Sequence, residues 1–305
     1  MIGLCGCGNM GAAIAVRLAG PAGGLRVFDL DAEKAAAVAE AVGASAVASL
    51  ADLAGSPGPT EPTGSEGSGQ HALTVVLSLP HAAASRAVVA DLATVLAPGS
   101  VIVETSTVAP SDVRAAATAC EPAGVLVVDA AILSGVAQMQ AGTSALLIGG
   151  ADEAVAAAQP VLDALAERQV RLGALGTGMA AKVANNAVSH AVMVVLLEAA
   201  ALAEAEGISR AAFTEMLQAP DAGLMRPLTH RLAERVANGD YEGGMPTEAA
   251  RKDSEIALAM AKESGVPLFA IEAAHTPYEL AVAAGYGRLD YAVLARLWER
   301  WKPPS

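Results

Sequence analysis

The chain opens with the stretch MIGLCGCGNMG at residues 1–11, and this stretch decides the fold. Its apolar first part, Met1–Cys5, predicts a buried strand, and the apolar run Ala12–Ala19 predicts a helix. Between the strand and the helix stands the pattern Gly-x-Gly-x-x-Gly. A strand, a glycine turn and a helix in this order are the beginning of a dinucleotide-binding unit.

Each glycine of this turn has its own physical task. Gly6 permits the tight turn, Gly8 lets the backbone approach a pyrophosphate, and Gly11 lets the helix lie close to the strand. Asn9 and Met10 complete the turn at the helix start, where unpaired N–H groups and the positive end of the helix dipole favour phosphates. A purely structural glycine turn is the alternative, but the flanking elements favour a binding site.

Asp29 narrows the choice of cofactor. It follows the second predicted strand, Leu25–Phe28. A carboxylate there accepts hydrogen bonds from ribose hydroxyls and repels a 2′-phosphate. Leu30 and Asp31 come next, with no arginine that could hold such a phosphate, so NAD is favoured over NADP. Asp29 could instead cap the predicted helix Ala32–Val42, but Asp31 can take that task.

The composition limits the classes of partner. The 305 residues suggest two domains, and 53% apolar residues provide for a large core. Only 3% of the residues are aromatic, which argues against stacking platforms for single-stranded nucleic acid. The net charge of −13 argues against nucleic acid and other polyanions. One small anionic ligand held locally is compatible with this charge.

Three cysteines, Cys5, Cys7 and Cys120, make no disulfide framework. Cys5 and Cys7 flank the turn without a cluster of His or Cys partners, so we expect no metal site. This cysteine usage is typical of a reducing compartment, and the N-terminus has neither the basic region nor the cleavage signal of a signal peptide. We therefore expect a cytoplasmic protein.

The apolar stretch Ala187–Ala203 raises the question of a membrane span. It is interrupted by Ser189, His190 and Glu198. We therefore expect a buried helix, and no membrane as a partner.

Strands and helices alternate through the first half of the chain. Short runs rich in valine and leucine predict buried strands, and longer runs between them predict helices. The predicted strands are Leu73–Leu79, Val101–Glu104, Val125–Ala131 and Ser144–Gly149, and the predicted helices are Ala82–Leu96, Ser111–Cys120 and Ala151–Leu165. This order predicts an α/β fold with a Rossmann-type, doubly wound parallel sheet in a dinucleotide-binding domain of residues 1–175.

The segment 55–70 interrupts this alternation. It is rich in Pro, Gly, Ser and Glu and has no apolar period. We expect a surface insertion in one crossover, with a lid or a partner-binding loop as the functional alternative.

The pattern changes after Gly178. A long apolar helix is predicted over Met179–Glu206, and Gly207 ends it. Everything that follows predicts helices, namely Arg210–Gln218, Thr229–Ala237, Thr247–Ser264, Leu268–Ala284 and Tyr291–Trp298. We therefore expect a C-terminal all-α domain, residues 176–305, joined to the first domain by the long helix.

Polar residues and turns follow three of the predicted strands. Ligands of a doubly wound sheet bind beyond the carboxyl ends of its strands. Leu79-Pro80 ends one strand, Ser106-Thr107 follows a second, and Leu133-Ser134-Gly135 follows a third. Each alone could be ordinary turn chemistry, but all three lie at the edge where ligands bind.

Lys182, Asn185 and Asn186 stand at positions i, i+3 and i+4 of the long helix, so they share one face. A lysine in such an apolar helix either pairs with an acid or has a lowered proton affinity and can act as an acid or base. The alternative is a lysine whose ammonium reaches solvent at a helix end. Further on, Lys252-Asp253 stands near the start of a later helix and would ordinarily be a solvated charged turn.

Together these segments resemble the β-hydroxyacid dehydrogenase family, which includes 3-hydroxyisobutyrate dehydrogenase and tartronate semialdehyde reductase. The resemblance runs over nearly the whole chain. The glycine turn is similar to the family's cofactor fingerprint, and Gly142-Thr143 to the end of its substrate-loop signature. Lys182 with Asn185 and Asn186 matches the catalytic Lys-x-x-Asn-Asn pattern, the most specific of these motifs. Lys252-Asp253 matches a C-terminal pair whose lysine lies near the cofactor.

The resemblance implies a role for each matched residue. Lys182 would be the general acid and base on the substrate oxygen, and Asn186 would orient Lys182 or the substrate. The family's sites often have a second subunit nearby, so a homodimer or homotetramer is implied, with the helical domain serving substrate binding and oligomerisation. The implied cofactor contacts, besides the glycine turn and Asp29, are Leu79, Pro80, Thr107 and Lys252; the implied substrate contacts are Ser106, Leu133, Ser134, Gly135 and Asn185.

The substrate loop departs from the family, which usually has Asp-Ala-Pro-Val-Ser-Gly-Gly where this chain has DAAILSG at residues 129–135. Without a gap Leu133 stands in the place of the serine, whereas a shift of one residue lets Ser134-Gly135 recover part of the motif. Gln138-Met139 stands where Gly-Ala is common. An apolar wall at Leu133 predicts poor turnover of very polar acids such as glycerate, and better turnover of acids with an apolar substituent.

We therefore expect an oxidoreductase that transfers a hydride between NAD and a small hydroxy acid similar to 3-hydroxyisobutyrate. A reductase of imines or other non-acid carbonyls is one alternative, but imine reductases share the fold and usually lack the catalytic lysine. A non-catalytic NAD-binding scaffold is the other alternative. Lys182 argues against both.

Overall fold

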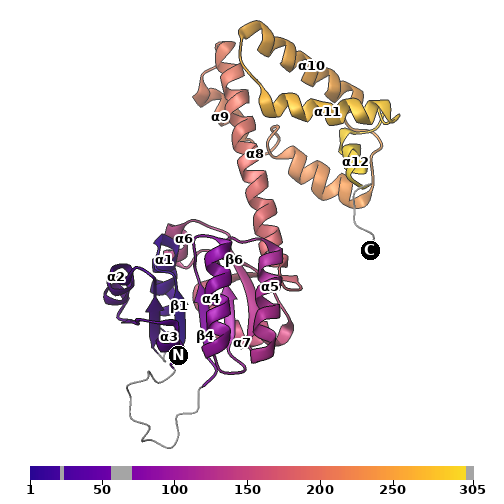
Figure 1. Cartoon of the computed structure of the whole chain (residues 1–305). Coiled ribbons are helices and arrows are strands. Elements are labelled where there is room, and N and C mark those ends of the chain that lie inside the picture. Colours follow the sequence, from indigo (N-terminus) through magenta and orange to yellow (C-terminus); the bar gives the residue numbers. More distant parts are fainter. Residues whose placement is uncertain (21–23, 56–70, 300–305) are drawn as a thin grey trace, which may run out of the picture. The chain divides into compact units, whose positions relative to one another are not determined.

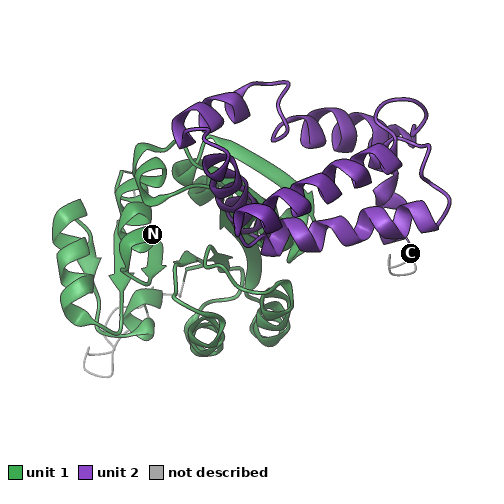
Figure 2. Cartoon of the chain, turned by 90° about the horizontal axis from the view of Figure 1, so that it is seen from above, with its two compact units in different colours: residues 1–186 green, residues 187–305 purple. Residues whose placement is uncertain are grey.

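The computed structural model describes residues 1–20, 24–55 and 71–299. The predicted insertion at 55–70 therefore lies, except for Gly55, outside the described residues. The internal contacts divide the chain into two compact units, residues 1–186 and 187–305 (Figure 2). The division falls within the long helix α8, Thr177–Ala205, which links the units, whereas the predicted boundary stands at the start of this helix.

The first unit contains one eight-stranded sheet in the order β3-β2-β1-β4-β5-β6-β7-β8. Its first six strands are parallel, as in a doubly wound fold, which confirms the predicted fold class. The strands are β1 Ile2–Cys5, β2 Leu25–Phe28, β3 Ser45–Ala46, β4 Thr74–Leu77, β5 Val101–Glu104, β6 Leu126–Ile132, β7 Ala145–Gly149 and β8 Arg168–Gly173.

The far edge of the sheet differs from the prediction. Strand β7 runs antiparallel to β6, and β8 pairs parallel to β7, so the sheet is not parallel throughout. The sequence analysis did not predict β8 at all. Its sequence RQVRLG is polar and largely exposed, because an edge strand has a neighbour on one side only and needs no continuous apolar run.

Helices cover both faces of the sheet and form two cores with it (Figure 1). Helices α1, α2 and α7 supply the first core, and α3, α4 and α5 supply the second. The helices of this unit, before α8, are α1 Asn9–Leu18, α2 Ala32–Val42, α3 Leu50–Ala54, α4 Ala82–Val95, α5 Pro110–Cys120, α6 Val136–Ala141 and α7 Asp152–Leu165, with a short 3₁₀ turn η1 at Glu121–Ala123.

The second unit is built from helices, as predicted. Besides the part of α8 from residue 187 onward, its described elements are α9 Arg210–Gln218, the π-helix η2 Pro227–Val236, α10 Thr247–Ser264, α11 Phe269–Ala283, the 3₁₀ turn η3 Tyr291–Leu294 and α12 Ala295–Glu299. Glu198 of α8 holds α11 in place. Its carboxylate accepts hydrogen bonds from the amides of Phe269, Ala270 and Ile271 at 2.8–3.1 Å, which caps the start of α11.

Helix α8 corrects the expectation of a buried helix at Ala187–Ala203. Within one chain its middle part is exposed: Val188 is 64% exposed, and Met193 and Leu197 are each 54% exposed. The prediction was wrong because an apolar sequence indicates that a surface will be covered, and does not say that the same chain covers it. Among the described helices, α8 alone is long and apolar enough to cross a membrane by length and composition, a test that core helices also pass.

Candidate active site

The loops that follow strands β2, β1, β4 and β5 lie side by side at one edge of the sheet. Backbone hydrogen bonds continue the ladder beyond the strands, from Gly6 N to Phe28 O at 2.8 Å, from Ser78 N to Cys5 O at 2.9 Å, and from Thr105 N to Leu77 O at 3.0 Å. The glycine turn and two of the predicted polar turns are therefore brought together. This carboxyl edge is where doubly wound folds bind ligands.

The glycine turn has the geometry that a dinucleotide requires. Gly6 has φ +100°, and a Cβ there would lie 2.1 Å from Ser78 O. A Cβ on Gly11 would lie 2.0 Å from Gly6 O, so the helix can pack this close only on glycine. By contrast, nothing lies within 4 Å of a Cβ on Gly8, which leaves its backbone open to a ligand. The exposed Asn9 and half-buried Met10 begin α1, and no side chain caps this helix start.

Asp29 is tied to the glycine turn. Its Oδ2 accepts a hydrogen bond from Cys7 N at 2.7 Å, and its Oδ1 accepts one from Asp31 N at 2.9 Å. Asp31 caps α2 by accepting from the amides of Glu33 and Lys34, as expected. Asp29 therefore does not cap α2, and each of its carboxylate oxygens has a lone pair left for a ribose hydroxyl.

Ser106 connects two of the edge loops. Its hydroxyl accepts a hydrogen bond from Leu79 N at 2.8 Å, and its own amide donates to the carboxylate of Glu104 at 2.8 Å. Glu104 is buried and also bonds the hydroxyl of Ser85; burial raises the pKa of this carboxyl above its usual range. The sequence analysis missed Glu104 as a support of this edge. The neighbouring Pro80 and Thr107, both exposed, remain predicted cofactor contacts.

In the substrate loop, Leu133 packs against the core, whereas Ser134 makes a polar contact. Leu133 is half-buried and packs against the second core. The hydroxyl of Ser134 lies 2.5 Å from that of the buried Ser144, a partner that no sequence pattern indicated. Gly135 is exposed and is the N-cap residue of α6. The substrate roles of these residues stay predictions, and the packing of Leu133 favours Ser134 as the loop's polar group.

Lys182 lies on the second turn of α8. It is half-buried, and burial lowers its pKa below the ordinary value for lysine. No ion pair to Lys182 is present among the described residues. Asn186 is half-buried and Asn185 is exposed, and the Asn185 amide donates to Asn186 Oδ1 at 3.5 Å. A lysine without an acidic partner and with a lowered pKa can exchange a proton near neutral pH more readily than a surface lysine.

The start of α8 depends on Asp129, which the sequence analysis did not choose as a site residue. This residue of β6 is fully buried, and its carboxylate accepts from Gly176 N and Met179 N, both at 2.7 Å. Burial raises the pKa of Asp129, while the hydrogen bonds from backbone amides oppose the rise. An acid inside a predicted apolar strand was the available signal, because a buried carboxylate must find donors.

Lys252 belongs to the second unit. It lies on α10 with 62% of its side chain exposed and is 3.0 Å from the carboxylate of Asp253. The predicted contact of Lys252 with a cofactor remains a prediction.

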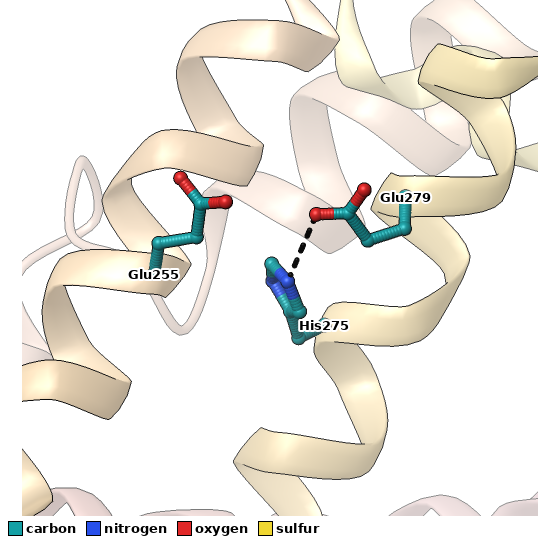
Figure 3. Close-up of side chains that lie close together, drawn as sticks. All are labelled: Glu255, His275 and Glu279. Carbon is teal, nitrogen blue, oxygen red and sulfur yellow. Dashed lines mark ion pairs between the residues drawn. The ribbon is translucent and has the colours of Figure 1, made fainter.

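Glu255, His275 and Glu279 gather between α10 and α11, with one potential metal-ligand atom from each within 4.8 Å of the others (Figure 3). The guanidinium of Arg251 already pairs with both carboxylates of this cluster, because its Nη1 lies 2.5 Å from Glu255 Oε1 and 2.9 Å from Glu279 Oε1. His275 Nε2 lies 3.2 Å from Glu279 Oε1. The arrangement is an ion-pair network that joins two helices.

The three cysteines are buried free thiols. Burial raises the pKa of Cys5 to about 12 and that of Cys120 to about 11, and burial with the nearby Asp29 raises the pKa of Cys7 to about 11. All three stay protonated near neutral pH, so none is a reactive thiolate.

The glycines of the turn make a sharp test. Gly8→Ala should leave the melting temperature unchanged, because its Cβ meets open space, yet weaken dinucleotide binding by about tenfold or more. Gly11→Ala should instead destabilise the free protein by about 1–3 kcal/mol through overpacking. Isothermal titration and thermal unfolding separate the two effects. Unchanged dinucleotide affinity in Gly8→Ala would show that no ligand passes over Gly8.

Comparison with known proteins identifies the family of the chain. Residues 1–174 match the family model of the NAD-binding domain of 6-phosphogluconate dehydrogenase, and residues 176–298 match the NAD-binding model of NADP-dependent 3-hydroxyisobutyrate dehydrogenase. The NAD-dependent L-serine dehydrogenase of Pseudomonas aeruginosa is 30% identical over 98% of this chain and 97% of its own length.

Solved structures show the same fold over the whole chain. The 3-hydroxyisobutyrate dehydrogenase of Mycobacterium tuberculosis, solved with L-serine, is 27% identical with a TM-score of 0.63, covering 97% of this chain and 98% of its own. An imine reductase from Pseudomonas sp. has a TM-score of 0.80 at 23% identity and the same coverage, which shows the fold alone. The two family models and the full-length relatives together establish that this chain belongs to the β-hydroxyacid dehydrogenase family and is a nicotinamide-dinucleotide-dependent oxidoreductase.

Proposed function

We propose that this enzyme interconverts a small β-hydroxy acid and its aldehyde, with NAD as the hydride carrier and Lys182 as the general acid and base. The observation that carries the proposal is Lys182 itself. It is a half-buried lysine with a lowered pKa, on a helix that starts at the carboxyl edge of the sheet. The open backbone at Gly8 and the uncapped start of α1 lie at the same edge and suit a pyrophosphate.

The names of the relatives support the substrate class. One is an L-serine dehydrogenase, one a 2-(hydroxymethyl)glutarate dehydrogenase and others 3-hydroxyisobutyrate dehydrogenases. Their three named substrates share a hydroxymethyl group on the carbon next to a carboxylate. The proposed substrate therefore has the form HOCH₂–CHR–COO⁻. The packing of Leu133 into the core leaves Ser134 and Gly135 to hold the carboxylate through O–H and N–H groups.

In the proposed reaction, Lys182 exchanges one proton with the substrate oxygen. A bound nicotinamide would supply the hydride acceptor for the hydroxymethyl carbon. Neutral Lys182 takes the hydroxyl proton as the C–O bond becomes a carbonyl, and it returns that proton when the aldehyde is reduced. Asn186, one turn further along α8, orients the lysine or the substrate. Burial supports this role, because it favours the neutral form of the amine.

Removal of the acid and base should abolish most of the activity. Lys182→Ala should lose about 10² to 10⁴ in kcat while it still binds NAD. Lys182→Arg should lose a similar factor, because a guanidinium keeps the charge but cannot release a proton. The exposed Lys262→Ala is the matched control and should retain the parent rate. Near-native turnover of Lys182→Ala would leave Lys182 as a packing residue only.

The pH profile follows from the direction of the pKa shift. Oxidation needs neutral Lys182, so kcat/KM for the alcohol should rise with pH and level off below the ordinary pKa of lysine. Reduction needs the protonated amine and should fall over the same range. The two pH profiles are measured on the parent enzyme of the preceding test. Profiles that do not run in opposite directions would argue against Lys182 as the general acid and base.

NAD is proposed as the preferred cofactor, because the Asp29 carboxylate binds the glycine turn and the residue after it is the exposed Leu30, not an arginine. Asp29→Ala combined with Leu30→Arg should lower the NAD to NADP ratio of kcat/KM by about tenfold or more, since a hydrogen bond to a charged group is lost. Leu30→Arg alone is the control that keeps the carboxylate. A parent enzyme that uses NADP at least as well as NAD would contradict the assignment of Asp29.

A homo-oligomer is proposed from the exposed part of α8. Between residues 177 and 197 the titratable side chains of this helix are Lys182 and His190, and several large apolar residues are exposed. An apolar surface of this extent is typical of an interface. The net charge of −13 disfavours an anionic membrane surface, so a second copy of the chain is the proposed occupant.

Two lysines on this surface should separate the subunits. Met193→Lys with Leu197→Lys, one turn apart, should convert a dimer or tetramer into a monomer, because two charges would be buried without partners. Size-exclusion chromatography with light scattering measures the mass. Val16→Lys, a similarly exposed position on α1, is the control. A monomeric parent protein would refute the proposed interface.

An imine or non-acid carbonyl reductase remains the second candidate. The replacement of the family's usual serine by Leu133 is the sequence feature that favours it, whereas the packing of Leu133 against the second core and the presence of Lys182 argue against it. Absorbance at 340 nm with a panel of β-hydroxy acids and cyclic imines distinguishes the two functions. A cytoplasmic location is proposed as well, since three free thiols suit a reducing compartment.

A further inference from the structure

Asp129 joins the sheet to the helix that carries Lys182. It lies on β6 beside Glu104 of β5 and Gly149 of β7 in the strand register. Its two carboxylate oxygens each accept one amide from the start of α8, Gly176 N and Met179 N, at 2.7 Å. No ion pair to Asp129 is found among the described residues, so backbone amides are what balance this buried carboxylate.

The slot that holds this carboxylate leaves it little freedom. A Cβ on Gly149 would lie 2.5 Å from Asp129 Oδ1, and a Cβ on Gly178 would lie 2.8 Å from Asp129 Oδ2. The same Cβ on Gly178 would lie 2.3 Å from Leu147 O. The first turn of α8 therefore contacts the backbone of β7 directly. Because both sides are backbone, the helix start cannot slide without losing the two amide bonds.

Lys182 stands three residues after Met179, so its Cα lies about 4.5 Å further along the helix axis. The Met179 side chain is fully buried in the second core, while its amide is bound by Asp129. Both constraints act one turn below the lysine. We propose that Asp129 is a positioning residue that sets the height and rotation of α8, and thereby the place of the Lys182 amine at the reacting alcohol.

This inference rests on the proposed function of Lys182 and adds a second residue to it. The charged groups around Asp129 are few. Glu104 turns its carboxylate to Ser85 and to the Ser106 amide, and Arg114 of α5 lies close to Gly176. Burial, and no nearby charge, is what lowers the pKa of Lys182. Asp129 therefore acts on the lysine through placement, and a displaced lysine would be better solvated.

Asp129→Asn is the first test. The amide group offers one acceptor and sets an NH₂ against the second backbone N–H, so one anchor is lost at constant size. We expect kcat to fall by about 10²-fold, the typical cost of a misplacement of about 1 Å. The apparent pKa of the kcat profile should move to higher pH, and the Kd for NAD should stay within about twofold of the parent value. Asp129→Ser, which fits the same slot without a clash, should show the same direction of change.

Glu198→Gln is the matched control. Glu198 also accepts backbone amides at a helix start, but that of α11. It should lower the melting temperature and leave the pH profile of kcat in place. A loss of turnover in Glu198→Gln equal to that in Asp129→Asn would reduce Asp129 to a general stabilising residue. Failure of both Asp129 variants to fold would likewise assign it to folding and overturn the proposal.

The double variant Asp129→Asn with Lys182→Ala separates the two hypotheses. If Asp129 acts through the lysine, the double variant should be no slower than Lys182→Ala alone. A further loss in the double variant would contradict action through Lys182. If Lys182→Ala is itself fully active, the proposed function fails. If Lys182→Ala is inactive but Asp129→Asn keeps the parent kcat and profile, only the positioning role fails.

Discussion

The structure depends on carboxylates that accept hydrogen bonds from backbone amides. Asp29 binds the amide of Cys7 in the glycine turn, Glu104 binds that of Ser106, Asp129 binds two at the start of α8, and Glu198 binds three at the start of α11. An ionised carboxylate is costly to bury unless donors replace its water, and helix starts offer unpaired donors. The chain has 32 acidic and 19 basic residues, so it cannot pair every acid with a cation.

Among the described residues, this use of acids orders the candidate site without ion pairs to Asp29, Glu104 or Asp129. Backbone amides donate hydrogen bonds to Asp29 and Glu104, and the Ser85 hydroxyl also donates to Glu104. Lys182 then remains without an ion-pair partner among the described residues. An acidic partner would have raised its pKa and held its proton. Burial without a partner does the opposite, which suits an amine that must both take and return a proton.

Much of this could be predicted from sequence because the constraints are local. The glycine turn needs its three glycines at fixed spacing, and helices such as α10, Thr247–Ser264, show their period and their C-terminal glycine, Gly265, directly. Strand β8 was not predicted, because an exposed edge strand carries no apolar run. The direction of β7 was not predicted, because the short helix α6 between β6 and β7 has no strong sequence pattern. Asp129 was not predicted as a site residue for another reason. Its partners, Gly176 and Met179, are distant in sequence, and an acid within a strand does not say which amides it will meet.

The exposed part of α8 completes this argument. The prediction that Ala187–Ala203 is buried was wrong for the single chain, in which Val188, Met193 and Leu197 are exposed. The same helix is anchored at its start by Asp129 and holds α11 through Glu198. Helix α8 is therefore fixed by hydrogen bonds at its start, to the sheet, and near its end, to α11. Lys182 and Asn186 lie between these two fixed points. A partner that covered the helix beside them would therefore also change their exposure to solvent. Burial within the single chain already lowers the pKa of Lys182.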